Sequence, residues 1–339
     1  MDKIAFRKET SEVYLKAVPE LSSVVHGQRG ITKSIIEWKY INNPSGKAHV
    51  WIASDINNNK IVGTYALCPW KMNCNGKNYD AVQAVDAMVH PDYRKMGIFT
   101  QLQKTAIKDL ENSEYKIAIS FPPANSYLGH IKAGWIKVGN LFDYTFIMRP
   151  VDKIFDKNAY KFIKKTFLDE IYYRGICMMY SKYVAFNKEN GKKEFQNDII
   201  GTNDNKMFCY KNNEYLEWKY VKNPIQANSE IILCNSSKYK GFIVLNENRR
   251  ESVVIKDVYP LFDGTEFYDV INLLMRIGVL KYANTLKFST SLNLHRKKFS
   301  KGILKRKSDI HVMVHMLNNK FEYSKNLEWI FNYGDIDIG

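Results

Sequence analysis

A nine-residue segment that occurs twice limits the ways in which this chain can fold. Ile36-Glu-Trp-Lys-Tyr-Ile-Asn-Asn-Pro44 returns as Leu216-Glu-Trp-Lys-Tyr-Val-Lys-Asn-Pro224, an offset of 180 residues. Each copy is followed by a polar gap and two apolar strands, at 49–54 and 61–66 in the first copy and at 230–234 and 241–245 in the second. A chain of 339 residues suits two domains. We therefore expect two related domains in tandem.

The boundary between these domains is expected near residue 150. The strand 144–148 ends at Arg149-Pro150, and a helical segment, roughly 153–170, follows it. The predicted domains are therefore 1–150 and 151–339. In the first domain we predict two helices up to about residue 42, strands at 49–54, 61–72 and 81–89, a helix at 97–112, a strand at 116–121, a helix at 126–133 and a strand at 136–148. An antiparallel start with one βαβ crossover predicts a mixed sheet flanked by helices.

The segment from Asp86 to Leu102 reads as a strand, a turn and a helix start suited to an anion. Pro91 ends the strand, and Arg94, Lys95 and Gly97 fill the turn. Glycine lets the backbone approach a ligand closely, and the first N–H groups of a helix have no partner within the helix. The helix dipole adds positive charge beside two cationic side chains. These features favour a pyrophosphate. The competing interpretation is an ordinary strand-to-helix turn with a solvated Arg-Lys pair.

At these residues the sequence resembles the GNAT family of acetyl-CoA-dependent N-acetyltransferases. The family motif, Arg/Gln-x-x-Gly-x-Gly/Ala, stands here as Arg94-Lys-Met-Gly97-Ile-Phe99, with Phe99 in place of the final small residue. The resemblance continues at Phe121-Pro-Pro-Ala-Asn125 and at Gly134-Trp135, and it covers about residues 1–150. It implies an α/β (α+β) chain of two tandem GNAT-like domains, each a mixed, mostly antiparallel twisted sheet flanked by helices. The cofactor contacts that it implies are Met88, Val89, Arg94, Lys95, Met96, Gly97, Ile98, Phe99, Thr100 and Asn125.

The second copy keeps the scaffold but loses the cationic turn. After its central strand, 252–259, the chain reads Pro260-Leu-Phe-Asp-Gly-Thr-Glu-Phe267, and a helix is expected to about residue 282. Asp263 and Glu266 place negative charge where phosphates need positive charge. We expect one acetyl-CoA site per chain and a degenerate second domain that shapes the acceptor pocket or stabilises the first domain.

Acetyl transfer needs a neutral amine, a polarised thioester carbonyl and a proton for the departing thiolate. Asp86 precedes the cofactor turn and could accept a proton from the acceptor ammonium or bind it; a solvated or capping carboxylate is the alternative. The family often places a tyrosine four residues before the Gly-aromatic pair, and His130 stands there. Tyr127, one helical turn earlier, is the rival proton donor. The resemblance implies that backbone N–H groups of Met88 and Val89 polarise the carbonyl.

Charge and cysteine content restrict partners and compartment. The formal net charge is +15, from 50 Lys and Arg against 35 Asp and Glu, so coenzyme A, acidic glycans, nucleic acid and anionic lipid are all suitable partners. Five cysteines without a C-x-x-C pair fit a reducing compartment. The polar N-terminus does not resemble a signal peptide, and no apolar run approaches the ~20 residues that span a bilayer. We expect a cytoplasmic protein.

Three further features have mainly structural interpretations. The Glu-Trp-Lys-Tyr segments are expected to pack, although Trp38 and Glu37 could face the acceptor. The basic run 296–307 is either a solvated face or a docking surface for an acidic glycan, a lipid head group or RNA. His311-Val-Met-Val-His315 has helical metal-ligand spacing but alternates like a strand, so no metal is expected.

The sequence therefore favours an acetyl-CoA-dependent N-acetyltransferase that acts on a primary amine of a small molecule or amino sugar. Two alternatives stay open. One is an aminoacyl transferase of the tandem GNAT-like type, which would use charged transfer RNA and bind it through the basic run. The other is a non-catalytic binding module. The acceptor and the oligomeric state are not predicted.

Overall fold

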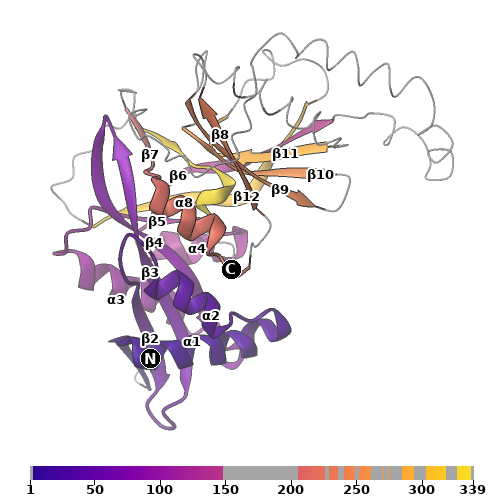
Figure 1. Cartoon of the computed structure of the whole chain (residues 1–339). Helices are drawn as coiled ribbons and strands as arrows, with labels where there is room; N and C mark the ends of the chain where they lie inside the picture. The colour runs from indigo at the N-terminus through magenta and orange to yellow at the C-terminus, as the bar shows by residue number, and fades with distance from the viewer. Residues whose placement is uncertain are drawn as a thin grey trace.

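The computed structural model describes residues 3–147, 205–225, 229–235, 240–248, 252–260, 270, 274, 285–293, 303–317 and 327–336 (Figure 1). The expected boundary near residue 150, the helical segment 153–170 and nearly all of the helix expected up to residue 282 lie outside these residues. No helix in the described part of the chain is long and apolar enough to span a bilayer.

The elements of the first half follow the predicted order, with one addition. They are β1 (Ile4–Glu9), α1 (Ser11–His26), α2 (Lys33–Ile36), a π-helical turn (Glu37–Ile41), β2 (His49–Asp55), β3 (Ile61–Cys74), β4 (Lys77–Val89), a 3-10 turn (Pro91–Tyr93), α3 (Ile98–Leu110), β5 (Ile117–Ser120), α4 (Ala124–Lys132) and β6 (Ile136–Ile147). The unexpected element is β1, which pairs antiparallel with β2. Its sequence, IAFRKE, carries three charges in six residues and has little apolar alternation to reveal it.

The first elements described in the second half repeat the order of those in the first half: a strand, a short helix with a π-helical turn, and three strands. The second half comprises β7 (Lys206–Cys209), α8 (Asn213–Leu216), a π-helical turn (Glu217–Val221), β8 (Ser229–Asn235), β9 (Lys240–Asn248), β10 (Ser252–Tyr259), β11 (Thr285–Thr290), β12 (Ile303–Met316), β13 (Glu328–Ile330) and a 3-10 turn (Tyr333–Asp335). The predicted strands 230–234, 241–245 and 252–259 are confirmed as β8, β9 and β10. His311 and His315 lie in β12, so the strand interpretation of that segment is also confirmed.

The two halves share one twisted mixed sheet, and their last strands are exchanged. The strand order is β1-β2-β3-β4-β5-β12-β6-β11-β10-β9-β8, and β7 pairs with β3 and with β13. In each half the central strand has a parallel neighbour, β4 with β5 and β10 with β11. The strand beside β5 is β12, and the strand beside β11 is β6. Each half is therefore completed by a strand from the other.

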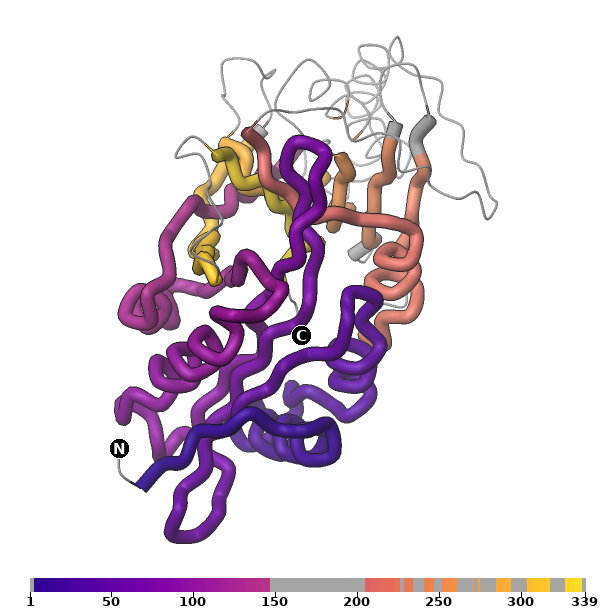
Figure 2. Tube along the Cα trace, turned by 90° about the vertical axis from the view of Figure 1, so that its left-hand side faces the viewer, coloured from indigo at the N-terminus to yellow at the C-terminus, as the bar shows by residue number. Residues whose placement is uncertain are grey.

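Helices cover both faces of the sheet in the first half. On one face, α3 packs over β2, β3 and β4 and buries Ile98, Leu102 and Ala106. On the other face, α1 and the segment around residue 36 bury Tyr14, Val18 and Ile36. Figure 2 shows the strands between these two layers, with α1 and α3 on opposite sides. This arrangement brings the start of α3 to the end of β4.

The repeated Glu-Trp-Lys-Tyr segments pack against each other across the two halves. The rings of Trp38 and Trp218 stack with centroids 5.0 Å apart. Each indole N–H donates to the main-chain oxygen of the other tryptophan, at 2.8 Å and 2.9 Å. The ammonium of Lys219 lies over both rings. This reciprocal contact is the one expected of a pseudo-twofold axis, and it confirms the predicted packing role of the repeat.

Candidate active site

The site begins where β4 and β5 separate. The two strands pair in parallel only from Ala81 opposite Ile117 to Gln83 opposite Ile119. Beyond that point β4 continues to Val89 without β5 beside it. Its pairing with β3 is also interrupted, because Ala66 lies opposite Val85 whereas Thr64 lies opposite Met88. The extra β4 residues form a bulge, in which Asp86 has a φ of 47°.

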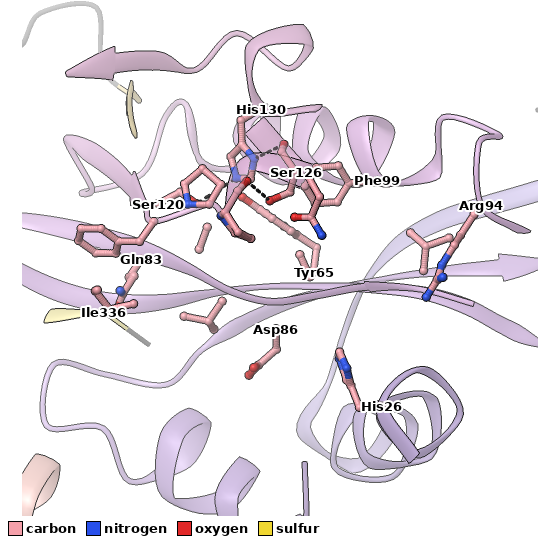
Figure 3. Close-up of a pocket in the computed structure, with 18 residues that line it drawn as sticks. His26, Tyr65, Gln83, Asp86, Arg94, Phe99, Ser120, Ser126, His130 and Ile336 are labelled. Carbon is pink, nitrogen blue, oxygen red and sulfur yellow. Dashed lines mark hydrogen bonds between the residues drawn. The ribbon is translucent and has the colours of Figure 1, made fainter. Parts of the chain in front are cut away.

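A cavity of about 550 Å³ occupies this splay (Figure 3). Figure 3 shows Ser120, His130 and Phe99 on one side of the strands, and Asp86 and His26 on the other. Arg94 and Val89 line the cavity beside the turn, and Asn125 and Ser126 line it from the start of α4. The cavity thus connects the side lined by His130 and Phe99, next to the turn, with the side lined by Asp86 and His26.

The turn before α3 has the geometry of an anion site. Gly97 is the N-cap of α3 with a φ of 78°, and Lys95 has a φ of 64°. The first backbone bond of the helix runs from the N–H of Gln101 to the carbonyl of Gly97 at 3.0 Å. The N–H groups of Ile98, Phe99 and Thr100 therefore precede the first helical bond and are available to a ligand. Both Arg94 and Lys95 are exposed. The turn can hold a pyrophosphate through N–H groups, dipole and cations together.

Phe99 replaces the small residue of the motif because α4 has a matching gap. A Cβ added at Gly129 would lie 2.5 Å from Cε1 of Phe99, so the ring rests directly on the glycine. The ring also meets His130 edge-on, with centroids 5.4 Å apart. The large residue on α3 is thus accommodated by the absence of a side chain on α4. The Phe99 ring also forms an aromatic part of the cavity wall.

His130 is buried in the cavity wall with both ring nitrogens engaged. Nδ1 lies 3.0 Å from the carbonyl oxygen of Ser126, and Nε2 lies 2.9 Å from Oγ of Ser120. Trp135, like Phe99, packs edge-on against the ring. Burial lowers the pKa of His130, and the contact with the Ser126 carbonyl offsets this only in part. The sequence analysis did not identify Ser120 as a site residue. The signal that could have identified it is a hydroxyl side chain at the end of a buried strand.

Tyr127 lies elsewhere, although it shares a helix with His130. Its ring packs on His311 of β12, with centroids 4.4 Å apart. Lys137 of β6 lies over the same ring at 5.3 Å. Tyr127 does not line the cavity, whereas His130 does. Of the two predicted proton donors, the structure brings His130 to the splay.

Asp86 lines the cavity from the opposite face and is held in a polar network. Its carboxylate oxygens lie 3.1 Å and 3.0 Å from Nζ of Lys39. The hydroxyl of Tyr40 donates to Oδ2 at 2.8 Å. The Lys39 and Asp86 side chains are only 3% and 5% exposed. The repeated segment that was predicted to pack therefore also holds a predicted site residue.

Met88 and Val89, the last two residues of β4 before the turn, have different surroundings. Met88 is buried in the core under α1. The N–H of His90 donates to Val62 in β3 at 2.8 Å. Because successive residues of a strand point their N–H groups to opposite sides, the N–H of Val89 is directed toward the splay. Val89 also lines the cavity.

The second half contains a related network at the bulge of β10. Asp257 lies at the bulge of β10 and accepts from Tyr220, the repeat partner of Tyr40, at 2.8 Å. Lys211 lies 2.7 Å from both Asp257 and Asp335. Gly334 fits tightly here, since an added Cβ would lie 2.2 Å from the hydroxyl of Tyr220. The expected loss of the cationic turn concerns residues 261–267, which lie outside the described part of the chain.

This network fixes a C-terminal segment against the cavity of the first half. The side chain of Gln83 donates to the main-chain oxygen of Asp335 at 2.8 Å. Ile336 lines the cavity. Phe331 packs edge-on against Phe121, another lining residue, with centroids 5.0 Å apart. The cavity therefore has a wall made by the second half of the chain.

Comparisons with known proteins agree with this geometry. Residues 7–136 match the family model of the acetyltransferase (GNAT) domain. A conserved Enterococcus faecalis protein described as a probable N-acyltransferase has a TM-score of 0.60 at 12% identity, covering 93% of this chain and 72% of that one. A GCN5-related N-acetyltransferase from Anabaena variabilis has a TM-score of 0.58 at 10% identity, with 93% and 73% covered. Eis1 from Mycobacterium abscessus has a TM-score of 0.53 at 10% identity, with 93% and 74% covered. No curated protein sequence matches the chain.

At these identities the solved structures establish the fold, and the domain match concerns residues 7–136 of the 339. The domain match supports an acyltransferase, a class whose GNAT members use acyl-CoA. The first half of the chain is thus similar to the GNAT superfamily over residues 7–136.

Proposed function

We propose that this chain transfers an acetyl group from acetyl-CoA to a primary amine of a small molecule or amino sugar. The observation that carries the proposal is the cationic turn before α3 opening directly into the splay cavity. Arg94, Lys95 and the N–H groups from Gly97 to Thr100 would hold the pyrophosphate. Met96 and Ile98 are the remaining residues of this turn that we expect to contact the cosubstrate. The N–H of Val89 would polarise the thioester carbonyl, and Asn125 would contact the pantetheine arm.

His130 is the residue that we assign to proton transfer. It faces the cavity, whereas Tyr127 is occupied by His311 and Lys137. A buried imidazole can accept and return a proton near neutral pH when its partners hold it in place.

Asp86 is assigned to binding the acceptor ammonium rather than to accepting its proton. Protonation of Asp86 would remove the carboxylate charge that faces the buried ammonium of Lys39. Leaving a buried charge without its partner costs several kcal/mol, on the order of 3 to 5. The carboxylate therefore stays ionised, and it lines the cavity where the acceptor ammonium would bind. Met88 supports this bulge from the core.

The second domain, residues 151–339, is proposed to shape the acceptor side of the cavity. Ile336 and the contact between Gln83 and Asp335 support this role. One cosubstrate is expected per chain, because the cationic turn occurs only in the first copy of the sequence repeat.

The test is a screen for free thiol released from acetyl-CoA with amines, amino sugars, peptides and antibiotics as acceptors. The wild-type chain should release thiol with at least one amine, and Gly97→Glu should abolish the release by placing a carboxylate in the anion site. Lys71→Glu, at an exposed position of β3, is the matched control and should retain full activity. Binding of acetyl-CoA without turnover on any acceptor would contradict the enzymatic proposal.

A further inference from the structure

Ser120 occupies the point at which the sheet opens. It is the last residue of β5, directly after the final β4–β5 pair at Ile119. On its other side the strand stays paired, because Ser120 lies opposite Met313 of β12. The serine is 4% exposed and lines the cavity. A rigid strand therefore presents its hydroxyl at the splay.

The hydrogen bonds of His130 define its tautomer. A carbonyl oxygen can only accept, so Nδ1 carries the proton that is donated to Ser126 at 3.0 Å. Neutral imidazole then has a lone pair on Nε2, and the hydroxyl of Ser120, 2.9 Å away, donates to it. Phe99 and Trp135 enclose the ring, which is 4% exposed. Burial also favours the neutral ring by lowering the pKa of His130.

We propose that Ser120 exchanges protons with the reacting atoms and that His130 stores the proton between the two transfers. The inference rests on the proposed acetyl transfer and adds a catalytic residue to it. A hydroxyl bonded to a positioned neutral imidazole, whose other nitrogen is fixed by an acceptor, is the arrangement that activates hydroxyl groups in enzymes. Here the same arrangement serves a relay.

The relay balances with solvent water as the only further reactant. The acceptor ammonium first loses one proton to solvent water, and the resulting neutral amine attacks the thioester carbonyl, forming the C–N bond. The C–S bond then breaks to release coenzyme A thiolate. The proton lost by the amine nitrogen passes to Oγ of Ser120 as the hydroxyl proton passes to Nε2 of His130. The imidazolium is stabilised by the Ser126 carbonyl. The proton then returns from Nε2 through Ser120 to the thiolate, and both residues regain their starting states.

The experiment compares Ser120→Ala and Ser120→Thr with the wild-type chain, using acetyl-CoA and an amine identified by the thiol-release screen. Ser120→Ala should lower kcat by about 100-fold or more, the usual contribution of a positioned proton-transfer group, and leave the Kd for acetyl-CoA within about twofold. Ser120→Thr should restore much of kcat. Ser54→Ala, a buried serine on β2, is the control for loss of a hydroxyl.

Two further readouts separate the relay from a structural role. The wild-type rate should fall on the acid side, at a pH below the ordinary His pKa of ~6.5, because the relay needs neutral His130. His130→Gln should lower kcat and remove that limb. Nitrogen-15 spectra of the histidine side chains should show Nδ1 of His130 protonated and Nε2 bare.

Three results would overturn the relay. They are a Ser120→Ala rate within about threefold of the wild-type rate, a proton on Nε2 in the neutral state, and an acetyl group covalently attached to Ser120 after rapid quenching. Failure of the proposed function is distinguishable, since the wild-type chain would then bind no acetyl-CoA or release no thiol.

Discussion

Replacing Lys39 with methionine should destabilise the chain strongly, because it leaves the Asp86 carboxylate buried without this ammonium. The Nζ–Oδ2 distance is 3.0 Å, and the two side chains are 3% and 5% exposed. At that separation the attraction is about 5 kcal/mol for an effective dielectric constant of about 20. Removing the buried lysine also removes its own desolvation cost, so the expected loss is about 3 to 5 kcal/mol. Such a loss is a large share of a typical stability of about 5 to 15 kcal/mol.

Urea unfolding followed by tryptophan fluorescence measures this loss. Lys33→Met is the matched control, because Lys33 and Glu37 lie 3.6 Å apart with side chains 68% and 46% exposed. That exposed pair should contribute less than about 0.5 kcal/mol. Lys39→Met combined with Asp86→Asn should be less destabilised than the sum of the single changes. A loss below about 1 kcal/mol for Lys39→Met would refute the argument that the network around Asp86 is buried and paired.

Three other expectations follow from the packing and the charges. Gly129→Ala should lower the free energy of unfolding, measured in urea, by about 1 to 3 kcal/mol, because its Cβ would lie 2.5 Å from Phe99. The same change should also weaken acetyl-CoA binding. In a Phe99→Ala background, Gly129→Ala should cost no stability. Burial and the charge of Lys8 lower the pKa of His49 from 6.5 to about 4, so stability present above pH ~6.5 should fall as the pH drops through 4. Because solvent screens this partly exposed ring, the fall should be about 1 to 2 kcal/mol, and His49→Gln should flatten this part of the curve. Gln83→Leu should raise the KM for the acceptor and leave the acetyl-CoA Kd unchanged, because it removes the bond to Asp335; an equal effect on both would contradict the assignment of this wall to the acceptor.

Local sequence signals predicted the turn and most strands, because they act over short distances. Gly97 at the start of α3 and the apolar run 252–259 are examples of glycine chemistry and strand periodicity. The repeat predicted two related domains, and the described strands β2 to β4 and β8 to β10 follow it in the same order. The exchange of β6 and β12 was not predictable in this way, since either strand satisfies its periodicity in either half.

The unpredicted parts of the site depend on contacts between distant residues. Ser120 becomes a candidate catalytic residue only because α4 places Nε2 of His130 2.9 Å from its hydroxyl. The Gly129 gap explains Phe99 only when α3 and α4 are seen side by side. Lys211 forms ion pairs with Asp257 and Asp335, which lie 46 and 124 residues away in the sequence. Pattern and propensity do not encode such pairings.

Calorimetry of acetyl-CoA binding tests the central claim most directly. The wild-type chain should bind one acetyl-CoA, and Arg94→Glu combined with Lys95→Glu should weaken binding by several-fold to a hundredfold, as expected for the loss of about 1 to 3 kcal/mol of charge-assisted bonding. Lys71→Glu with Lys77→Glu makes the same change in net charge at exposed positions of β3 and β4 and should leave the affinity unchanged. Equal affinity in the wild-type chain and the Arg94/Lys95 variant would contradict the assignment of this turn as the cosubstrate site.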